Sequence, residues 1–177
     1  MIYSKILAIL AILGDLLAIT LLVILIFYRS NETGKKIINF FGKNSLLFSF
    51  LIALFATAGS LIYSEFLKFP PCPLCWYQRI FMYPIVILTA MAWRFKENIN
   101  KYIIALASIG GLFSLYHYLL EFGIVPSTFC SAEGVSCAQR LVFEFGFVSL
   151  PFMTLTGFIL IILFAVANNR IRSYQSS

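Results

Sequence analysis

The sequence SLLFSFLIALFATAGSLIYSEF, residues 45–66, is a nearly continuous apolar run of 22 residues. Only one of its side chains is charged, Glu65, and that residue lies next to the end of the run. About 20 mostly apolar residues form an α-helix long enough to cross the hydrocarbon core of a bilayer. A membrane strand would alternate apolar and polar side chains, and this run does not. The stretch therefore predicts a membrane-spanning helix.

Four further apolar runs lie before and after this one, at residues 6–27, 76–93, 102–120 and 150–167. The chain has 177 residues, of which 61% are hydrophobic and 11% charged, and its mean hydropathy is +0.94. A soluble domain carries about 25% charged residues. The polar side chains are too few to cover a soluble globule, so the sequence predicts an all-α integral membrane protein with five spans.

The basic residues predict how these spans are oriented. Most of the 13 Lys and Arg side chains follow the first, third or fifth run: Arg29, Lys35, Lys36, Lys43, Arg94, Lys96, Lys101, Arg170 and Arg172. Loops rich in Lys and Arg stay in the cytoplasm. We therefore expect the N-terminus outside and the C-terminus in the cytoplasm. This placement accounts for the net charge of +6, and we expect no nucleic-acid partner.

The first run predicts a retained span rather than a cleaved signal peptide. It is longer than the apolar region of a signal peptide, about 7–15 residues, and no small-residue cleavage site follows it. Residues 1–44 then form an N-terminal helix with a basic cytoplasmic linker, separate from residues 45–177. Asp15 lies inside this run, where an acid is costly, and the sequence predicts no mechanism for it.

All four cysteines fall in the two outer loops of this topology, where disulfides persist. Cys72 and Cys75 lie in the short loop before the third span, and Cys130 and Cys137 lie in the long loop 121–149. The second half of the long loop contains AQRLVFEFGF, residues 138–147. Its pattern fits either a short interfacial helix or an irregular loop.

The spacing of Cys72 and Cys75 has several interpretations. A c-type haem site needs a histidine after the second cysteine, and Trp76 stands there. A zinc site built from all four cysteines is disfavoured, because structural zinc sites use closely spaced ligand pairs in small folded modules. Structural disulfides explain Cys130 and Cys137 well. They explain Cys-Pro-Leu-Cys badly, since that spacing is typical of redox exchange.

The stretch KFPPCPLCWYQRIFMYP, residues 68–84, places Cys75 just before the third span at Trp76. The prolines around Cys72 are expected to keep the dithiol out of the helix. The helix N-terminus and Arg79, one turn further on, would then both stabilise a Cys75 thiolate. Such a thiolate can react with a lipid-soluble quinone, and Arg79 can hydrogen-bond a quinone oxygen. Arg79 equally fits a side chain that reaches up to the membrane interface.

The stretch PCPLCWYQRIFMYP resembles the quinone-binding Cys-x-x-Cys segment of the DsbB/BdbC disulfide-bond formation proteins, with Cys72, Cys75 and Arg79 at the matching positions. Further matches are YHYLL at residues 116–120, the loop with Cys130 and Cys137, and FGFVSLPFMTLTGF at the entry to the last span. The resemblance runs in order through residues 45–167. It implies a four-helix transmembrane bundle, to which the first span is an addition.

The family resemblance also implies a function. The protein would be a thiol:quinone oxidoreductase of the bacterial cytoplasmic membrane, with ubiquinone or menaquinone as its cofactor. It would reoxidise an exported thioredoxin-fold thiol oxidase of the DsbA/BdbD type. By analogy, the thiolate of that partner attacks Cys130, which is paired with Cys137. Electrons then pass to Cys72, and Cys75 faces the quinone.

His117 is the only histidine, and the resemblance places it near the quinone as a proton donor. A histidine that merely sits at the polar interface is the other interpretation. Two further functions stay open. An enzyme of the vitamin K epoxide reductase type is disfavoured, because in that family the loop cysteines precede the Cys-x-x-Cys pair. A metal-binding or scaffold module with structural cysteines remains an alternative.

Overall fold

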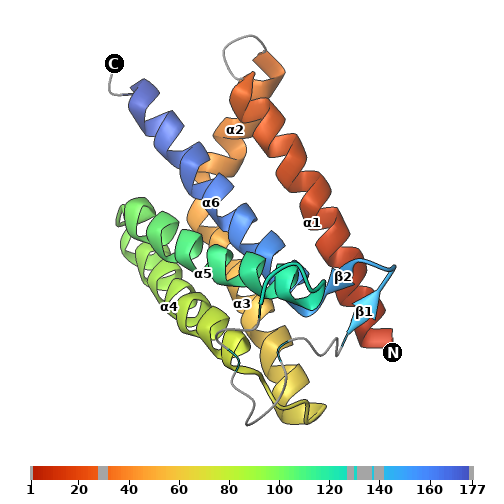
Figure 1. Cartoon of the computed structure of the whole chain (residues 1–177). Coiled ribbons are helices and arrows are strands. Elements are labelled where there is room, and N and C mark those ends of the chain that lie inside the picture. The colour runs from red at the N-terminus through yellow and green to blue at the C-terminus, as the bar shows by residue number, and fades with distance from the viewer. Residues whose placement is uncertain (1, 28–31, 127–129, 131–136, 138–141, 176–177) are drawn as a thin grey trace.

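A computed structural model describes residues 2–27, 32–126, 130, 137 and 142–175 (Figure 1). Its long helices are α1 (Ile2–Ile26), α3 (Ser45–Leu61), α4 (Pro73–Phe95), α5 (Asn100–Glu121) and α6 (Leu150–Gln175). A π-helical turn, η1 (Ile62–Phe66), continues α3. The described residues hold five helices long and apolar enough to cross a membrane, so the prediction of an all-α protein with five spans is confirmed.

Helices α3, α4, α5 and α6 pack into a bundle (Figure 1). Each contributes to one apolar core, which includes Ala53, Met82, Ile103 and the fully buried Phe158. Close approach of α5 and α6 depends on Gly110, because a Cβ there would overlap the Phe158 ring, only 2.6 Å from its Cε1 atom. Small residues allow membrane helices to approach closely and pack by van der Waals contact.

The predicted basic linker contains a helix that the sequence analysis missed, α2 (Glu32–Lys43). Gly34, Ile38 and Gly42 are buried on one face of α2, while Lys36 and Lys43 are exposed. The buried residues recur every four positions, which is the spacing of one helix face. This face packs against α6, so the segment after α1 is part of the folded molecule rather than a simple connection.

A second difference concerns the long outer loop. Its described part from residue 142 onward forms a β-hairpin of β1 (Phe143–Glu144) and β2 (Val148–Ser149), with Phe143 opposite Ser149. The interfacial helix considered for this segment is therefore wrong there. Phe145 and Gly146 have φ of 54° and 82°, and two consecutive left-handed residues reverse the chain. Residues 138–141 of the same segment lie outside the described residues.

The two ends of the chain lie at opposite ends of the molecule (Figure 1). The N-terminus lies beside the β-hairpin, and the C-terminus lies at the far end of α6. An odd number of spans requires this arrangement, so it agrees with the predicted topology. The start of α4 and the end of α5 bring the cysteines and His117 together, as described next.

Candidate functional site

Helix α4 begins at Pro73, and Cys72 is its N-cap residue. The Cys72 backbone is extended, with φ −71° and ψ 165°, and its Sγ accepts a hydrogen bond of 3.3 Å from the amide of Cys75. Proline suits the first helical position because its missing N–H would have had no partner there. The expectation that the prolines keep the dithiol out of the helix therefore holds for Cys72 and is wrong for Cys75, which lies in the first turn.

The helix N-terminus therefore stabilises a thiolate at Cys72, through the amide of Cys75. The sequence predicted that it would stabilise a thiolate at Cys75. Both thiols are free, and their Sγ atoms lie 2.9 Å apart. The hydrogen bond from the Cys75 thiol, assisted by His117 and the Cys75 amide, outweighs burial and lowers the pKa of Cys72 from 9.0 to about 4. Reduced Cys72 is thus a thiolate at neutral pH.

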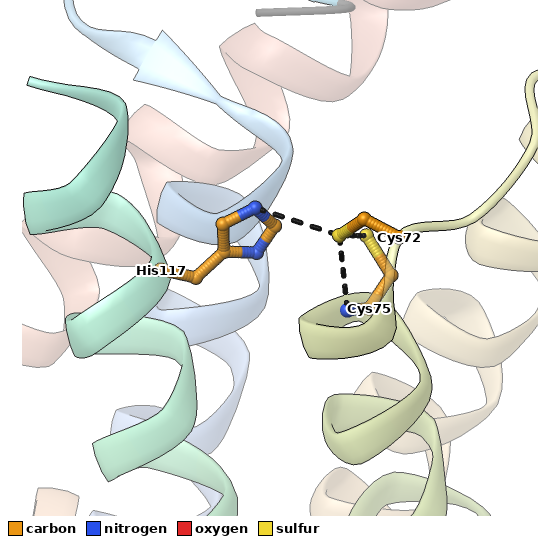
Figure 2. A group of neighbouring side chains, drawn as sticks. All are labelled: Cys72, Cys75 and His117. Atoms are coloured by element: carbon orange, nitrogen blue, oxygen red, sulfur yellow. Dashed lines mark hydrogen bonds between the residues drawn. The ribbon is translucent and has the colours of Figure 1, made fainter. Parts of the chain in front are cut away.

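His117 lies between the two cysteine pairs and is buried on the inner face of α5. Its Nε2 is 3.7 Å from Cys72 Sγ and 3.2 Å from the carbonyl oxygen of Cys137. Figure 2 shows the ring pointing from α5 toward the start of α4. The Gln78 amide nitrogen is 3.1 Å from His117 Nδ1. If that amide donates a hydrogen bond to Nδ1, the proton of the ring is on Nε2. The Nε2–H then faces the Cys72 sulfur and the Cys137 carbonyl oxygen.

The structure brings all four cysteines into one apolar cluster. Cys72 and Cys137 are buried in it beside Leu120, and Cys75 and Cys130 pack against them. Cys130 and Cys137 form a disulfide, with Cα atoms 6.1 Å apart. Only 1% of Cys137 is exposed, while Cys130 is half-buried. Two cysteine pairs that are far apart in the sequence are therefore neighbours in space.

The ligand atoms of Cys72, Cys75 and His117 lie within 4.8 Å of one another, close enough to hold a metal ion. The zinc site considered from the sequence needs Cys130 and Cys137 as well. In the disulfide these two residues offer no thiolate, and thiolate is the form of cysteine that binds metal.

A cavity of about 130 Å³ lies against the first turns of α4. Its lining is mostly apolar and includes Cys75, Gln78 and Arg79. Arg79 is only 6% exposed, donating from Nε to Ser60 Oγ and from Nη2 to the Ser60 carbonyl oxygen, both at 2.8 Å. Its Cζ lies 5.3 Å from the centre of the Trp76 ring. Arg79 is thus held inside the protein at the cavity, rather than extended to an interface.

Two hydroxyl groups of the same lining have no hydrogen-bond partner among the described residues. They are Thr57 Oγ1 on α3 and Tyr63 Oη on the π-helical turn. A buried hydroxyl without a partner is costly. Arg79 also has more N–H donors than its two bonds to Ser60 use. An apolar cavity with three such donors fits a flat apolar ligand that carries carbonyl oxygens.

His117 is not among the residues that line this cavity. Gln78 both lines the cavity and contacts His117, so it links the histidine to the cavity. Sequence reasoning did not single out Gln78, Thr57 or Tyr63. The only available signal was that each is a polar residue within an apolar run.

Comparisons with known proteins agree with this geometry. Residues 42–168 match the family described as Disulfide bond formation protein DsbB. Disulfide bond formation protein C of Bacillus subtilis is 42% identical over 131 residues, which cover 69% of this chain and 92% of that protein. The Probable disulfide formation protein C of Bacillus cereus is 45% identical over 119 residues, covering 66% and 86%. A Probable disulfide formation protein of Coxiella burnetii is 38% identical over 125 residues, covering 69% and 85%.

No solved structure matches the chain. The family match covers most of the chain and the same region that the motifs indicated, and the relatives are named for disulfide formation. This multi-pass membrane protein, with two cysteine pairs in one cluster, belongs to the DsbB family of disulfide bond formation proteins.

Proposed function

We propose that this protein is a thiol:quinone oxidoreductase that reoxidises an exported thioredoxin-fold thiol oxidase of the DsbA/BdbD type. Its place would be the bacterial cytoplasmic membrane, with the cysteines at the outer face, as the basic loops predict. The observation that carries the proposal is the single cluster of four cysteines, with the cavity beside Cys75. In this arrangement electrons enter at one pair and leave from the other.

The first step oxidises the partner. A thiolate of the partner attacks the Cys130 sulfur, which is more accessible than the buried Cys137. The Cys130–Cys137 bond breaks, and Cys137 leaves as a thiolate. The second thiolate of the partner then attacks the partner's first sulfur in the mixed disulfide and releases Cys130 as a thiolate. The partner departs as a disulfide, and Cys130 and Cys137 hold the two electrons as a dithiol.

The second step moves these electrons to an oxidised Cys72–Cys75 pair. The Cys137 thiolate attacks the Cys72 sulfur and releases a Cys75 thiolate. Cys130 then attacks Cys137, which restores the Cys130–Cys137 disulfide and releases Cys72. The Nε2–H of His117 is close to the Cys72 sulfur and stabilises it as the leaving group. A thiol with a low pKa leaves faster, and the pKa of Cys72 is about 4.

A membrane quinone, ubiquinone or menaquinone, supplies a lipid-soluble acceptor for two electrons and two protons. Cys75 would face it, because Cys75 is the cysteine that lines the cavity. Arg79 and the Tyr63 hydroxyl would donate hydrogen bonds to its carbonyl oxygens. Such donors stabilise negative charge where it develops during reduction. Gln78, which lines the cavity, holds the His117 ring through its hydrogen bond to Nδ1, so that the Nε2–H is directed toward Cys72.

The proposal is tested with purified protein in detergent and a reduced thioredoxin-fold partner. We expect oxidation of the partner to require an added short-tail quinone, and Cys75→Ser to abolish it. Cys130→Ser is the matched variant. It should lose oxidation of the partner, yet its Cys72–Cys75 dithiol, once reduced by a small dithiol, should still be oxidised by quinone. Normal turnover by Cys75→Ser would overturn the proposal, and stoichiometric zinc with unreactive thiols would favour the metal-binding alternative.

A further inference from the structure

Helix α1 lies outside the residues that match the family, which begin at residue 42. Nevertheless it packs closely along α6. Ala8, Ala11 and Ala18 are buried on its inner face, at intervals of three and seven residues. At Gly14 a Cβ would come within 3.1 Å of the Thr156 side chain. A face of small residues at helical spacing is the usual means of close packing between membrane helices.

Polar contacts fix the register of α1 against the rest of the molecule. Thr156 on α6 donates a hydrogen bond of 2.8 Å to the carboxylate of Asp15, which gives the intramembrane acid a partner. Near the N-terminus, Ser4 donates a hydrogen bond of 2.7 Å to Glu144 of the β-hairpin. Together with the small-residue face, these two contacts hold α1 at one depth.

This register places Leu7 in the lining of the cavity that also holds Cys75 and Arg79. Leu7 faces α3, because a Cβ at Gly59 would lie 3.9 Å from Leu7 Cδ1, and it shares the cavity lining with Leu150 and Met153 of α6. The next leucines of α1 point away, since Leu10 and Leu13 are 58% and 55% exposed. Among the side chains that the structure describes, Leu7 is therefore the one by which α1 lines the cavity between α3 and α6.

We propose that α1 is a wall of the acceptor cavity, and that Leu7 is a specificity-determining contact for the ring of the bound quinone. The identification of the ligand as a quinone rests on the proposed function. The position of Leu7 and α1 at the cavity does not depend on that function. A cavity of about 130 Å³ is small, so the volume of one side chain decides how much ring it accepts. A smaller residue at position 7 favours a fused two-ring naphthoquinone over a one-ring benzoquinone, and a larger residue does the opposite.

Binding of short-tail benzoquinone and naphthoquinone to the full chain tests the ring contact. Cys75→Ser serves as the parent, so that no electron transfer follows binding. We expect Leu7→Trp to weaken binding about tenfold, more for the naphthoquinone, since a single misplaced methylene already changes binding by about 10-fold or more. Leu7→Ala should shift the preference toward the naphthoquinone. Leu10→Trp and Leu10→Ala are the matched controls and should behave as the parent. Equal dissociation constants for the parent and both Leu7 variants would overturn the ring contact.

A second measurement tests the wall without any quinone. In a Cys72→Ser background with the Cys130–Cys137 disulfide intact, Cys75 is the only free thiol. The rate at which a membrane-soluble maleimide labels Cys75 should rise in Leu7→Ala and fall in Leu7→Trp, with no change in the two Leu10 variants. Unchanged labelling in both Leu7 variants overturns the inference. If labelling responds but the parent binds no quinone, the wall stands, and the proposed acceptor and its ring contact are overturned.

Discussion

Cys72 differs from Cys75 because it stands one residue before α4, where helix N–H groups have no backbone partner. Its sulfur accepts hydrogen bonds from the Cys75 amide and from the Cys75 thiol. It also lies next to His117 Nε2. The sequence showed which residues were present at this position. It did not show which sulfur accepts a hydrogen bond from a backbone amide of the helix N-terminus. The reason is that Pro73 was interpreted as a helix breaker rather than as the first helical residue.

The pKa of Cys72 leads to a pH prediction for the reduced protein. Folding lowers this pKa from 9.0 to about 4, so the thiolate adds stability that is complete above pH 9.0 and is lost as the pH falls toward 4. The rate of alkylation of Cys72 by iodoacetamide, followed by peptide mass spectrometry, should stay constant down to about pH 5 and fall below that. His117→Ala should move this fall to higher pH. A rate that declines steadily below pH 9 would contradict the assignment.

Arg79 should matter for the acceptor rather than for the partner. It is buried at the cavity and fixed by Ser60, and Cys130 is not among the residues that line this cavity. We expect Arg79→Ala to raise the apparent KM for quinone about tenfold or more, as for a lost hydrogen bond to a charged group of about 1.5–3 kcal/mol. Steady-state kinetics at varied quinone concentration and at varied partner concentration separate the KM for quinone from the KM for the partner. Arg94→Ala, which removes an exposed arginine of the same helix, is the control. A change only in the KM for the partner would refute this placement of the acceptor.

Single polar residues in the spans were the hardest part of the site to predict. Gln78, Thr57 and Tyr63 each stand alone among apolar neighbours, so no spacing pattern connects them. Their common role appears only when α3 and α4 are packed together around the cavity. Arg79 was predicted because it follows a recognisable cysteine motif by four residues.

At the scale of elements, the contact between α5 and α6 depends on one glycine. A Cβ at Gly110 would lie 2.6 Å from Phe158 Cε1, and Phe158 is fully buried and cannot move aside. The neighbouring Gly111 has room, since its Cβ would lie 3.6 Å from Phe158 Cβ. We expect Gly110→Ala to destabilise the protein by about 1–3 kcal/mol, as overpacking does. Gly111→Ala should be close to neutral. Thermal unfolding in detergent compares the Gly110→Ala and Gly111→Ala variants. Equal melting temperatures for the two variants would contradict this packing.

The long helices were predictable because a span needs an unbroken apolar run, and the run 45–66 coincides with α3 and η1. The elements outside the five long helices were not predictable from the sequence. Helix α2 was hidden because its apolar face contains Gly34 and Gly42, which carry no hydrophobic side chain to mark the period. The β-hairpin was hidden because β1 and β2 have two residues each, too few to show alternation.

At the scale of the whole molecule, the decisive feature is that two distant cysteine pairs converge. Helix α4 supplies Cys72 and Cys75, and the loop after α5 supplies Cys130 and Cys137. The sequence predicted that both pairs lie on one side of the membrane. Spacing and topology made a relay between the pairs plausible, and the family resemblance supplied its direction and its acceptor. Neither gave the distance between the loops, because spacing along the chain carries no information on it. The packing of α1 against the cavity was likewise outside the reach of the sequence.

The most direct test is to trap the disulfide that links the two pairs. In the double variant Cys75→Ser with Cys130→Ser, the relay predicts that mild oxidation joins Cys72 to Cys137, since both are buried in one cluster. Peptide mass spectrometry identifies this bond. The double variant Cys75→Ser with Cys137→Ser leaves Cys72 and Cys130, and it should form an internal bond more slowly because Cys130 lies at the edge of the cluster. A Cys72–Cys137 bond in high yield is the predicted result. Its absence, with both thiols still free, would contradict the relay.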